Sequence, residues 1–189
     1  KQTILTVGRF FDSLHSKKQE VLVESFKKMV EDGLKEWRFQ LAGGTTKGGR
    51  EYIAKIESKA VGLPIEFYPD ASFSQLKKLY GEASIYWHGA GYGEQDPKRK
   101  EHFGISTVEA MASGCAPVVI NLGGQKEIVK QGKSGFLWDT LDDLISYTAR
   151  IIEDQNLRQK LAKEAIKRSK IFSKSKFCQN ILSVINGNH

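Results

Sequence analysis

Short apolar segments alternate with longer amphipathic segments along almost the whole chain. Runs such as VVIN at 118–121 and IYW at 85–87 are nearly all apolar, which is typical of strands buried on both faces of a parallel sheet. In residues 17–31, by contrast, apolar side chains recur at the spacing of a helix face. The alternation predicts an α/β fold, a Rossmann-like parallel sheet flanked by helices on both faces. The expected strands are residues 3–7, 37–41, 65–68, 84–87, 117–121 and 136–138, and the expected helices are 17–31, 52–61, 72–80, 107–113, 125–130, one beginning near 140, 157–169 and 174–185.

Length and composition bound the kind of protein. The 189 residues, 40% hydrophobic and 27% charged, suit a single domain spanning 1–189. No apolar run approaches the roughly 18 residues of a membrane span, and no signal-peptide pattern is recognisable, so a cytoplasmic location is expected. Because the sequence does not begin with methionine, we expect it to be a piece of a longer chain.

The net charge of +7 attracts phosphates, anionic lipid or nucleic acid. Most cations are spread over the expected helices, and the densest run is Lys98-Arg99-Lys100 in a long loop, residues 89–102. This run suggests peripheral contact with the cytoplasmic face of a membrane or with a phosphorylated lipid; the alternative is a solvated loop. Nucleic acid is not expected as a partner, because aromatic residues are not interleaved with the basic ones.

Several candidate ligand-binding residues follow strands and therefore converge on the carboxyl edge of the sheet, where such folds bind ligands. Gly8 permits a tight turn, and Arg9 can grip a phosphate with two parallel bonds. Lys17 adds a point charge before the first long helix, although Lys18 is an equally basic neighbour. Gly43 and Gly44 can let a nucleotide approach closely. The fingerprints of classical dinucleotide-binding sites and of P-loops are both missing.

The segment EHFGISTVE places two carboxylates, Glu101 and Glu109, eight positions apart around an expected helix start. A helix start presents free N–H groups and a positive dipole end, so it suits a phosphate. The two carboxylates can then bracket a phosphorylated ligand that is rich in hydroxyls. The alternative for Glu109 is structural, because Ser106 and Glu109 fit a capping box with Ser106 as the N-cap.

Other residues have weaker signals. Gly123-Gly124 before a short helix is either a second anion nest or an ordinary turn, and Glu127 fits a first-turn acid. His88 and Tyr92 near the long loop either meet a sugar or pack the loop. No metal site is expected: the four histidines (15, 88, 102 and 189) form no ligand pattern and there is no Asp-x-Asp pair. Cys115 and Cys178 lie among apolar neighbours, so both are expected to be buried free thiols.

Taken together, these segments resemble the C-terminal, donor-binding domain of family 4 retaining glycosyltransferases of the GT-B fold. The matching pieces are VGRF (7–10), a lysine near 17, LVESF (22–26), LAGG (41–44), LKKLYGEASIYW (76–87), EHFGISTVEAMASGCAPVV (101–119), GGQKEIV (123–129) and GKSGFLW (132–138). The resemblance implies a missing N-terminal Rossmann domain that binds a saccharide or lipid-linked acceptor. It also implies that the donor is a nucleotide diphosphate sugar of the UDP or GDP type, with no further cofactor required.

The resemblance implies roles position by position. Arg9 and Lys17 match the basic pair on the donor diphosphate, and Glu101 matches the first glutamate, close to the transferred sugar. Glu109 matches the second glutamate, which holds the ribose hydroxyls, and Tyr68 falls where the base is contacted. The remaining expected donor-binding residues are Gly8, Gly43, Gly44, Phe103, Gly104, Ile105, Ser106 and Thr107.

The chain departs from the family pattern at Trp87-His88-Gly89-Ala90, where Pro-Ser is frequent near 88–89, and in the length of the loop before Glu101. These departures concern the sugar side of the site. The implied reaction transfers a hexose with retention, with cations and the helix start opposing the charge of the leaving diphosphate. Glu101 would favour oxocarbenium character without acting as a covalent nucleophile, and the isolated domain is expected to be inactive.

Two other interpretations stay open. One is a GT-B sugar-nucleotide epimerase, which shares the nucleotide-binding residues but uses no acceptor. The other is a non-catalytic subunit that binds a sugar nucleotide.

Overall fold

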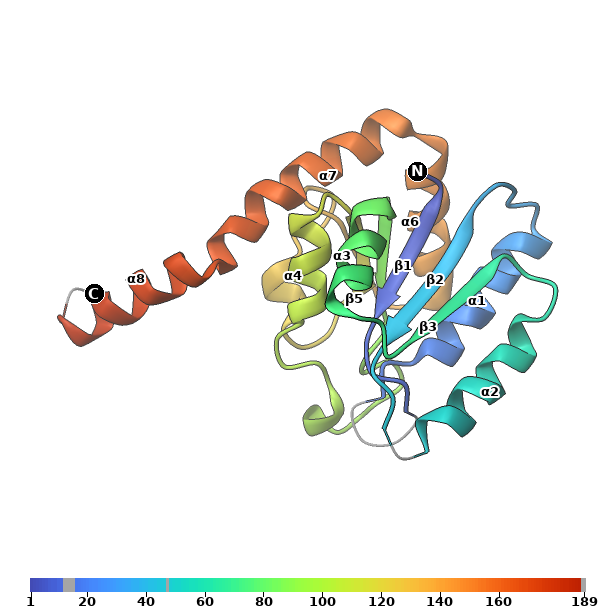
Figure 1. Ribbon diagram of the computed structural model, residues 1–189. Coiled ribbons are helices and arrows are strands. Elements are labelled where there is room, and N and C mark those ends of the chain that lie inside the picture. The colour runs from blue at the N-terminus through green and yellow to red at the C-terminus, as the bar shows by residue number, and fades with distance from the viewer. Residues whose placement is uncertain (12–15, 47, 188–189) are drawn as a thin grey trace.

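A six-stranded parallel sheet forms the centre of the protein in the computed structural model, which describes residues 1–11, 16–46 and 48–187 (Figure 1). His15 and His189 lie outside the described residues. The strand order is β3-β2-β1-β4-β5-β6, the order of a doubly wound sheet. The strands are β1 (Thr3–Val7), β2 (Arg38–Gly43), β3 (Ile65–Pro69), β4 (Ile85–His88), β5 (Ala116–Ile120) and β6 (Phe136–Trp138).

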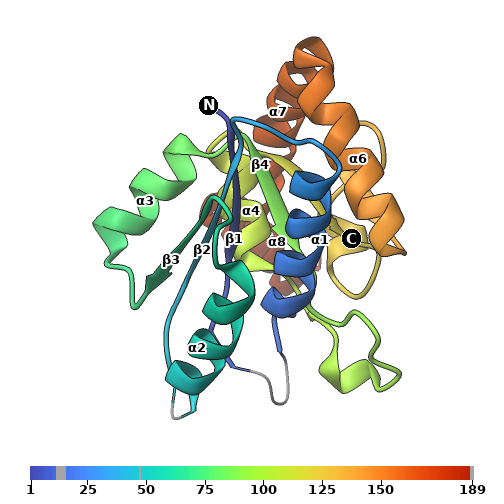
Figure 2. The same ribbon diagram turned by 90° about the vertical axis from the view of Figure 1, so that its right-hand side faces the viewer.

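Helices cover both faces of this sheet, as expected from the sequence (Figure 2). Neighbouring residues of one strand point to opposite faces, so Ile4 packs with one helix layer and Leu5 with the other. The layer on the Ile4 side contains α1 (Gln19–Glu31), α2 (Gly49–Ala60) and α6 (Leu141–Glu153). The layer on the Leu5 side contains α3 (Phe73–Glu82), α4 (Ile105–Ala112), α5 (Gln125–Ile128) and the C-terminal part of α7 (Gln155–Ser169).

The expected elements are all present, with ends that differ by up to three residues. The helix expected at 72–80 is α3, and Ser72 caps it by accepting a hydrogen bond from the N–H of Gln75 at 3.2 Å. The helix expected to begin near 140 is α6, where Thr140 and Asp143 form a complete capping box. The long loop after β4 contains one turn of 3₁₀-helix, η1 (Pro97–Arg99).

The expectation of two buried thiols is correct for Cys115 and wrong for Cys178. Cys115 is fully buried behind α4, and burial raises the pKa of its thiol to about 12. Cys178 is exposed because it lies on α8 (Lys174–Ile185), a helix that buries none of its residues. Its apolar neighbours in the sequence therefore do not cover it.

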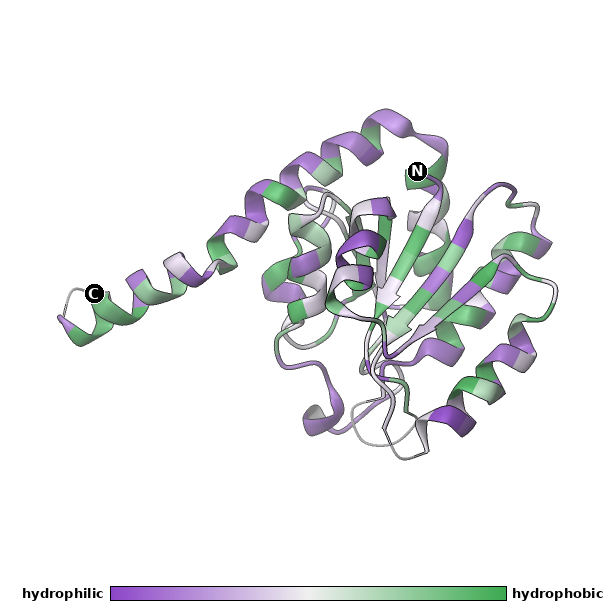
Figure 3. Ribbon diagram, viewed as in Figure 1, coloured by the Kyte–Doolittle hydropathy of each residue, from purple (hydrophilic) through white to green (hydrophobic). Residues whose placement is uncertain are grey.

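The α8 helix follows η2 (Lys170–Phe172) and extends away from the rest of the domain (Figure 1). Hydrophobic residues run along it (Figure 3), and the exposed ones are Phe177, Ile181, Leu182, Val184 and Ile185. None of the described helices combines the length and apolarity needed to cross a membrane.

Candidate functional site

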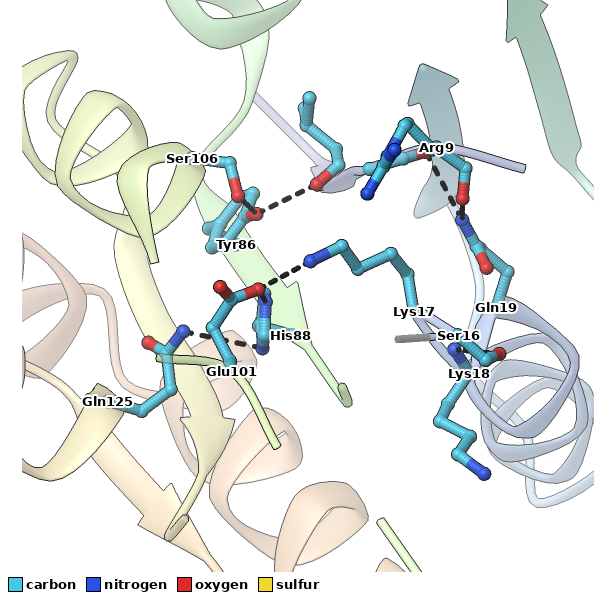
Figure 4. Close-up of polar contacts among 12 residues, drawn as sticks. Arg9, Ser16, Lys17, Lys18, Gln19, Tyr86, His88, Glu101, Ser106 and Gln125 are labelled. Atoms are coloured by element: carbon cyan, nitrogen blue, oxygen red, sulfur yellow. Dashed lines mark hydrogen bonds and ion pairs between the residues drawn. The ribbon is translucent and has the colours of Figure 1, made fainter. Parts of the chain in front are cut away.

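The loops after β1 and β4 meet at the carboxyl edge of the sheet, between the two strands where the chain switches direction. Figure 4 shows Lys17 approaching from the β1 side and Glu101 from the β4 side. Parallel strands expose their carboxyl ends at one edge, so residues far apart in the sequence become neighbours there. A hollow of about 230 Å³ lies at this point, lined by Arg9, Lys17, Ala90, Arg99, Lys100, Glu101 and His102.

Glu101 is held from two sides. The Lys17 ammonium contacts Glu101 Oε2, and the His88 ring places Nε2 3.4 Å from the same oxygen. On the other side of the ring, His88 Nδ1 lies 3.4 Å from Gln125 Nε2 (Figure 4). The Glu101 side chain keeps 18% of its surface exposed, whereas His88 is almost fully buried. Glu101 is therefore fixed in place but open to a ligand.

This environment keeps Glu101 ionised. The contact with His88 lowers the pKa of the Glu101 carboxyl, burial opposes that effect, and Lys17 lowers the pKa further, so the net pKa lies far below its usual range. Burial lowers the pKa of His88, and the attraction to Glu101 only partly opposes this. At neutral pH the site therefore holds a carboxylate beside a neutral imidazole.

The two neighbouring lysines, Lys17 and Lys18, have different partners in the structure. Lys17 reaches Glu101, whereas Lys18 turns to Glu94 in the long loop, with Lys18 Nζ and Glu94 Oε1 2.7 Å apart. A Cβ at Gly8 would lie 2.6 Å from Lys17 Cγ, so Gly8 leaves the room that the Lys17 stem occupies. Lys17, the lysine chosen from the sequence, is thus the one that lines the hollow beside Glu101.

Arg9 follows Gly8 and is exposed, with its guanidinium 5.1 Å from the centroid of the Phe11 ring. The side-chain amide of Gln19 fixes the turn by donating to the Gly8 and Arg9 carbonyls at 3.2 and 3.0 Å. No carboxylate among residues 1–11, 16–46 and 48–187 pairs with Arg9. An anion at Arg9 would therefore meet no competing carboxylate from these residues.

The capping-box alternative for Ser106 and Glu109 is not what the structure shows. The helix begins at Ile105, two residues earlier than expected, and its N-cap is Gly104 with φ 106°. Ser106 lies inside the first turn, where its hydroxyl accepts a hydrogen bond from Tyr86 at 2.7 Å. The reason for the error is Gly104: its left-handed backbone lets the helix start without a side-chain cap.

Glu109 therefore does not take part in capping α4. It is exposed, and one carboxylate oxygen accepts from the Tyr80 hydroxyl at 2.8 Å. In the described part of the chain, the N–H groups of Ile105 and Ser106 have no backbone acceptor. The start of α4 therefore presents N–H groups near Glu101 and a carboxylate one turn later.

The other residues of this segment differ in accessibility. Phe103 and Ile105 are exposed, and the Phe103 ring packs edge-on against Phe172 with centroids 5.8 Å apart. Thr107 is fully buried, so its side chain faces the core and not the surface. Only the backbone of Thr107 remains at the helix start, and its N–H donates to the Gly104 carbonyl at 3.1 Å.

Gly123 and Gly124 support the Glu101 loop. The Gly124 N–H donates to the Glu101 carbonyl at 2.9 Å, and a Cβ at Gly124 would lie 2.5 Å from the His102 carbonyl oxygen. The two glycines therefore permit close backbone packing, which fits the alternative of an ordinary turn. Tyr92 packs on Trp138 with ring centroids 5.4 Å apart, which supports the packing interpretation.

A second hollow, of about 480 Å³, adjoins Arg9 on the β2 side. Gly43 and Gly44 both line it, and because a Cβ at Gly43 would overlap the Gly8 carbonyl oxygen, Gly43 also lets two chain segments approach closely. Asp70, which the sequence did not indicate, ties two loops by accepting from the N–H and the hydroxyl of Thr45 at 2.7 and 2.6 Å. The hollow is lined by Val7, Gly8, Arg9, Gly43, Gly44, Asp70, Ala71 and Leu76.

Tyr68 is not brought to the Glu101 site. It lies on β3, the edge strand, and its hydroxyl donates to Glu66 at 2.5 Å and accepts from Gln40 at 3.4 Å. The bond to Glu66 raises the pKa of Tyr68. As for metals, the described residues include no group of three side chains of the kinds that bind them.

Comparison with known proteins gives a consistent picture. The family described as "Glycosyl transferases group 1" matches residues 1–168. The GDP-Man:Man(3)GlcNAc(2)-PP-Dol alpha-1,2-mannosyltransferase of Dictyostelium discoideum is 28% identical over 194 residues, covering 98% of this chain and 37% of that protein. A D-inositol 3-phosphate glycosyltransferase of Nocardioides sp. is 28% identical over 145 residues, covering 70% of this chain and 30% of that protein.

Solved structures share the fold. The Anabaena protein HepE in complex with UDP has a TM-score of 0.79 at 22% identity, covering 98% of this chain and 49% of that one. The C-terminal domain of a group 1 glycosyl transferase, LpcC, from Francisella tularensis has a TM-score of 0.70 at 20% identity, covering 92% of this chain and 86% of that one.

The chain spans 37% and 30% of the length of the two curated relatives described above. The family match, in contrast, covers residues 1–168 of the 189, including every residue of the site. This chain belongs to the glycosyl transferases group 1 family.

Proposed function

We propose that the whole protein is a retaining hexosyltransferase of the family 4 type and that these residues bind its donor, a nucleotide diphosphate sugar. One observation carries the proposal: an ionised carboxylate, Glu101, is held beside Lys17 and Arg9 at the start of α4. A sugar that becomes positively charged and a diphosphate that becomes more negative both find an opposite charge there.

The chemistry follows from these charges. As the bond between the anomeric carbon and the diphosphate breaks, its electron pair leaves with the diphosphate. Arg9, Lys17 and the N–H groups of Ile105 and Ser106 stabilise that leaving group, and so no further cofactor is required. Glu101 stabilises the positive charge that grows on the sugar ring. The acceptor hydroxyl oxygen forms the new bond to the anomeric carbon, and its proton goes to the leaving phosphate or to a group outside this chain.

We place the nucleoside of the donor in the second hollow, the one next to Gly44. Leu76 lines it, and Tyr80, one turn further along α3, holds Glu109, so Glu109 lies near the α3 wall of the hollow. We propose that Glu109 binds the ribose hydroxyls and that Gly44 allows the nucleotide to approach. GDP-Man stands in the name of the Dictyostelium relative, and HepE was solved with UDP, which supports a donor of the UDP or GDP type.

The acceptor is assigned to a domain outside these residues. We propose an N-terminal domain that binds a saccharide or lipid-linked acceptor in a cytoplasmic protein, with peripheral contact at the membrane face. The limited coverage of the relatives supports a longer chain. A sugar-nucleotide epimerase remains the second candidate, because it would use the same donor-binding residues.

The first test is binding of UDP, GDP and their glucose and mannose conjugates to the 189-residue chain, measured by calorimetry and thermal shift. One nucleotide should bind and raise the melting temperature, because a ligand at about 100 times its Kd stabilises the folded state by about 2.7 kcal/mol. Glu109→Gln should weaken that nucleotide about tenfold or more, the effect of losing a charged hydrogen-bond acceptor.

Glu127→Gln is the matched control, because Glu127 is also an exposed helix carboxylate but lies on α5 and, unlike Glu109, has no hydrogen bond to α3 among the described residues. It should leave the affinity unchanged. Binding of none of these ligands, or equal losses in the two variants, would contradict the proposal. Product analysis of the full-length protein with an acceptor then separates transferase from epimerase.

A further inference from the structure

His88 is an unusual residue for the floor of this site. It ends β4, its side chain is 3% exposed, and its ring lies directly under the Glu101 carboxylate (Figure 4). A buried imidazole is costly unless both ring nitrogens have suitable neighbours. The neighbours here are Glu101 Oε2 and Gln125 Nε2, each at 3.4 Å.

These two neighbours select one tautomer. A carboxylate only accepts hydrogen bonds, so the ring nitrogen that faces Glu101, Nε2, must carry the proton. Nδ1 is then an acceptor, which fits the Gln125 amide nitrogen on the other side. The opposite tautomer would place a nitrogen lone pair against the carboxylate. The contacts therefore line up Gln125, His88 and Glu101, and the contact from His88 Nε2 is longer than a regular hydrogen bond.

Gln125 is itself held in place. It is fully buried at the start of α5, and a Cβ at Gly104 would overlap its amide nitrogen. Gly104 therefore supports the start of α4 and also leaves the space in which the Gln125 side chain lies. This arrangement links β4, α4 and α5 beneath the Glu101 loop.

The two contacts on Glu101 involve the same oxygen. Lys17 and His88 both lie next to Oε2, and within the described part of the chain no hydrogen bond or ion pair uses Oε1. The Lys17 hydrogen bond and the longer His88 contact both hold Oε2. They leave Oε1 for a ligand in the hollow that Glu101 lines.

We propose that His88, oriented by Gln125, is a positioning residue that fixes the Glu101 carboxylate with Oε1 toward the transferred sugar. The inference rests on the proposed function, because it needs a sugar beside Glu101. It assigns a role on the sugar side of the site to the segment where the chain departs from the Pro-Ser that is frequent in the family.

The test compares the affinities for two ligands in one variant, using calorimetry. The ligands are the nucleoside diphosphate that wild type binds and its hexose conjugate. His88→Ala should weaken the conjugate about tenfold, because a contact to a charged group is lost, and should change the affinity for the bare nucleotide less than about twofold. His88→Gln, whose amide can donate as Nε2 does, should recover part of the loss.

Two further measurements exclude a merely structural effect. Imidazole ¹⁵N shifts of wild type should report the tautomer protonated at Nε2, and Gln125→Leu, which keeps the shape but removes the donor, should shift them. Glu101→Gln should reproduce the loss of discrimination seen in His88→Ala. Retained binding of the bare nucleotide shows that each variant is folded.

The outcomes separate the two proposals. If wild type binds neither ligand, the proposed function fails and the positioning role fails with it. If wild type binds both and His88→Ala weakens both equally, or neither, the positioning role alone is overturned. A wild-type tautomer protonated at Nδ1 also overturns it.

Discussion

At the scale of single residues, Gly43 and Gly44 are adjacent in the chain but differ in their surroundings. A Cβ at Gly43 would overlap the backbone of Gly8, whereas a Cβ at Gly44 would meet its nearest atom, Asp70 Oδ1, at 4.0 Å. Gly43→Ala should therefore lower the free energy of unfolding by about 1–3 kcal/mol, because backbone must move. Gly44→Ala should change it by less than about 0.5 kcal/mol. Urea denaturation of both variants measures the difference.

For nucleotide affinity, Gly44→Ala is the more informative variant, because it is not expected to disturb the fold. Gly44 lines the second hollow, so Gly44→Ala should weaken the nucleotide while leaving the fold intact. Equal stability losses in the two variants would contradict the close approach at Gly43. Unchanged nucleotide affinity in Gly44→Ala would place the ligand elsewhere.

The sequence predicts single site residues only as far as topology or family resemblance reaches. The residues after strands, such as Arg9 and Gly44, could be placed at one edge because parallel strands end there. The contacts His88–Gln125 and Tyr80–Glu109 could not be predicted, since each joins side chains 37 or 29 positions apart. Such pairs depend on how helices rotate over the sheet, and periodicity does not fix that rotation.

At the scale of elements, two helices have similar N-caps and very different packing. Thr140 caps α6, which buries Leu144, Thr148 and Ile151, whereas Ser173 caps α8, which buries nothing. Thr140→Ala should lower the free energy of unfolding by about 1 kcal/mol, the usual cost of a lost cap. Ser173→Ala should leave it unchanged, because fraying of an unpacked helix precedes global unfolding.

Chemical denaturation followed by tryptophan fluorescence reports this comparison. Trp87 and Trp138 are buried in the core of the sheet, so the signal follows global unfolding. A loss in Ser173→Ala as large as that in Thr140→Ala would show that α8 is part of the cooperative unit.

Element boundaries were least predictable where glycine replaces a side-chain cap. The start of α6 was visible in the sequence because Thr140 and Asp143 are good capping residues. The start of α4 was misplaced because the sequence around Ser106 fits a capping pattern, but Ser106 does not cap the helix in the structure. Gly104 determines that start through its backbone, and no side-chain pattern reports a left-handed φ.

At the scale of the whole molecule, the site couples stability to pH, because folding buries His88 in a neutral form. Burial puts the pKa of His88 in the folded state below the ordinary value of 6.5. Below about pH 6.5, His88 therefore becomes protonated in the unfolded chain while it stays neutral in the folded chain. Stability therefore falls as the pH drops. The slope from one such proton is at most about 1.4 kcal/mol per pH unit.

Glu101 acts in the same direction at lower pH. Its folded pKa lies below the ordinary 4.5, so its contribution is complete above that value and is lost only as the pH falls further. The interval between pH 7 and pH 5 therefore isolates His88. The general repulsion from the net charge of +7 affects wild type and variants alike.

We accordingly expect the free energy of unfolding of wild type to fall more between pH 7 and pH 5 than that of His88→Gln, whose side chain does not titrate. Urea denaturation at pH 7, 6 and 5 measures the two slopes. Parallel slopes would mean that His88 binds its proton equally well in both states. That would contradict a buried neutral ring, although not the donor-binding role of the edge at which it lies.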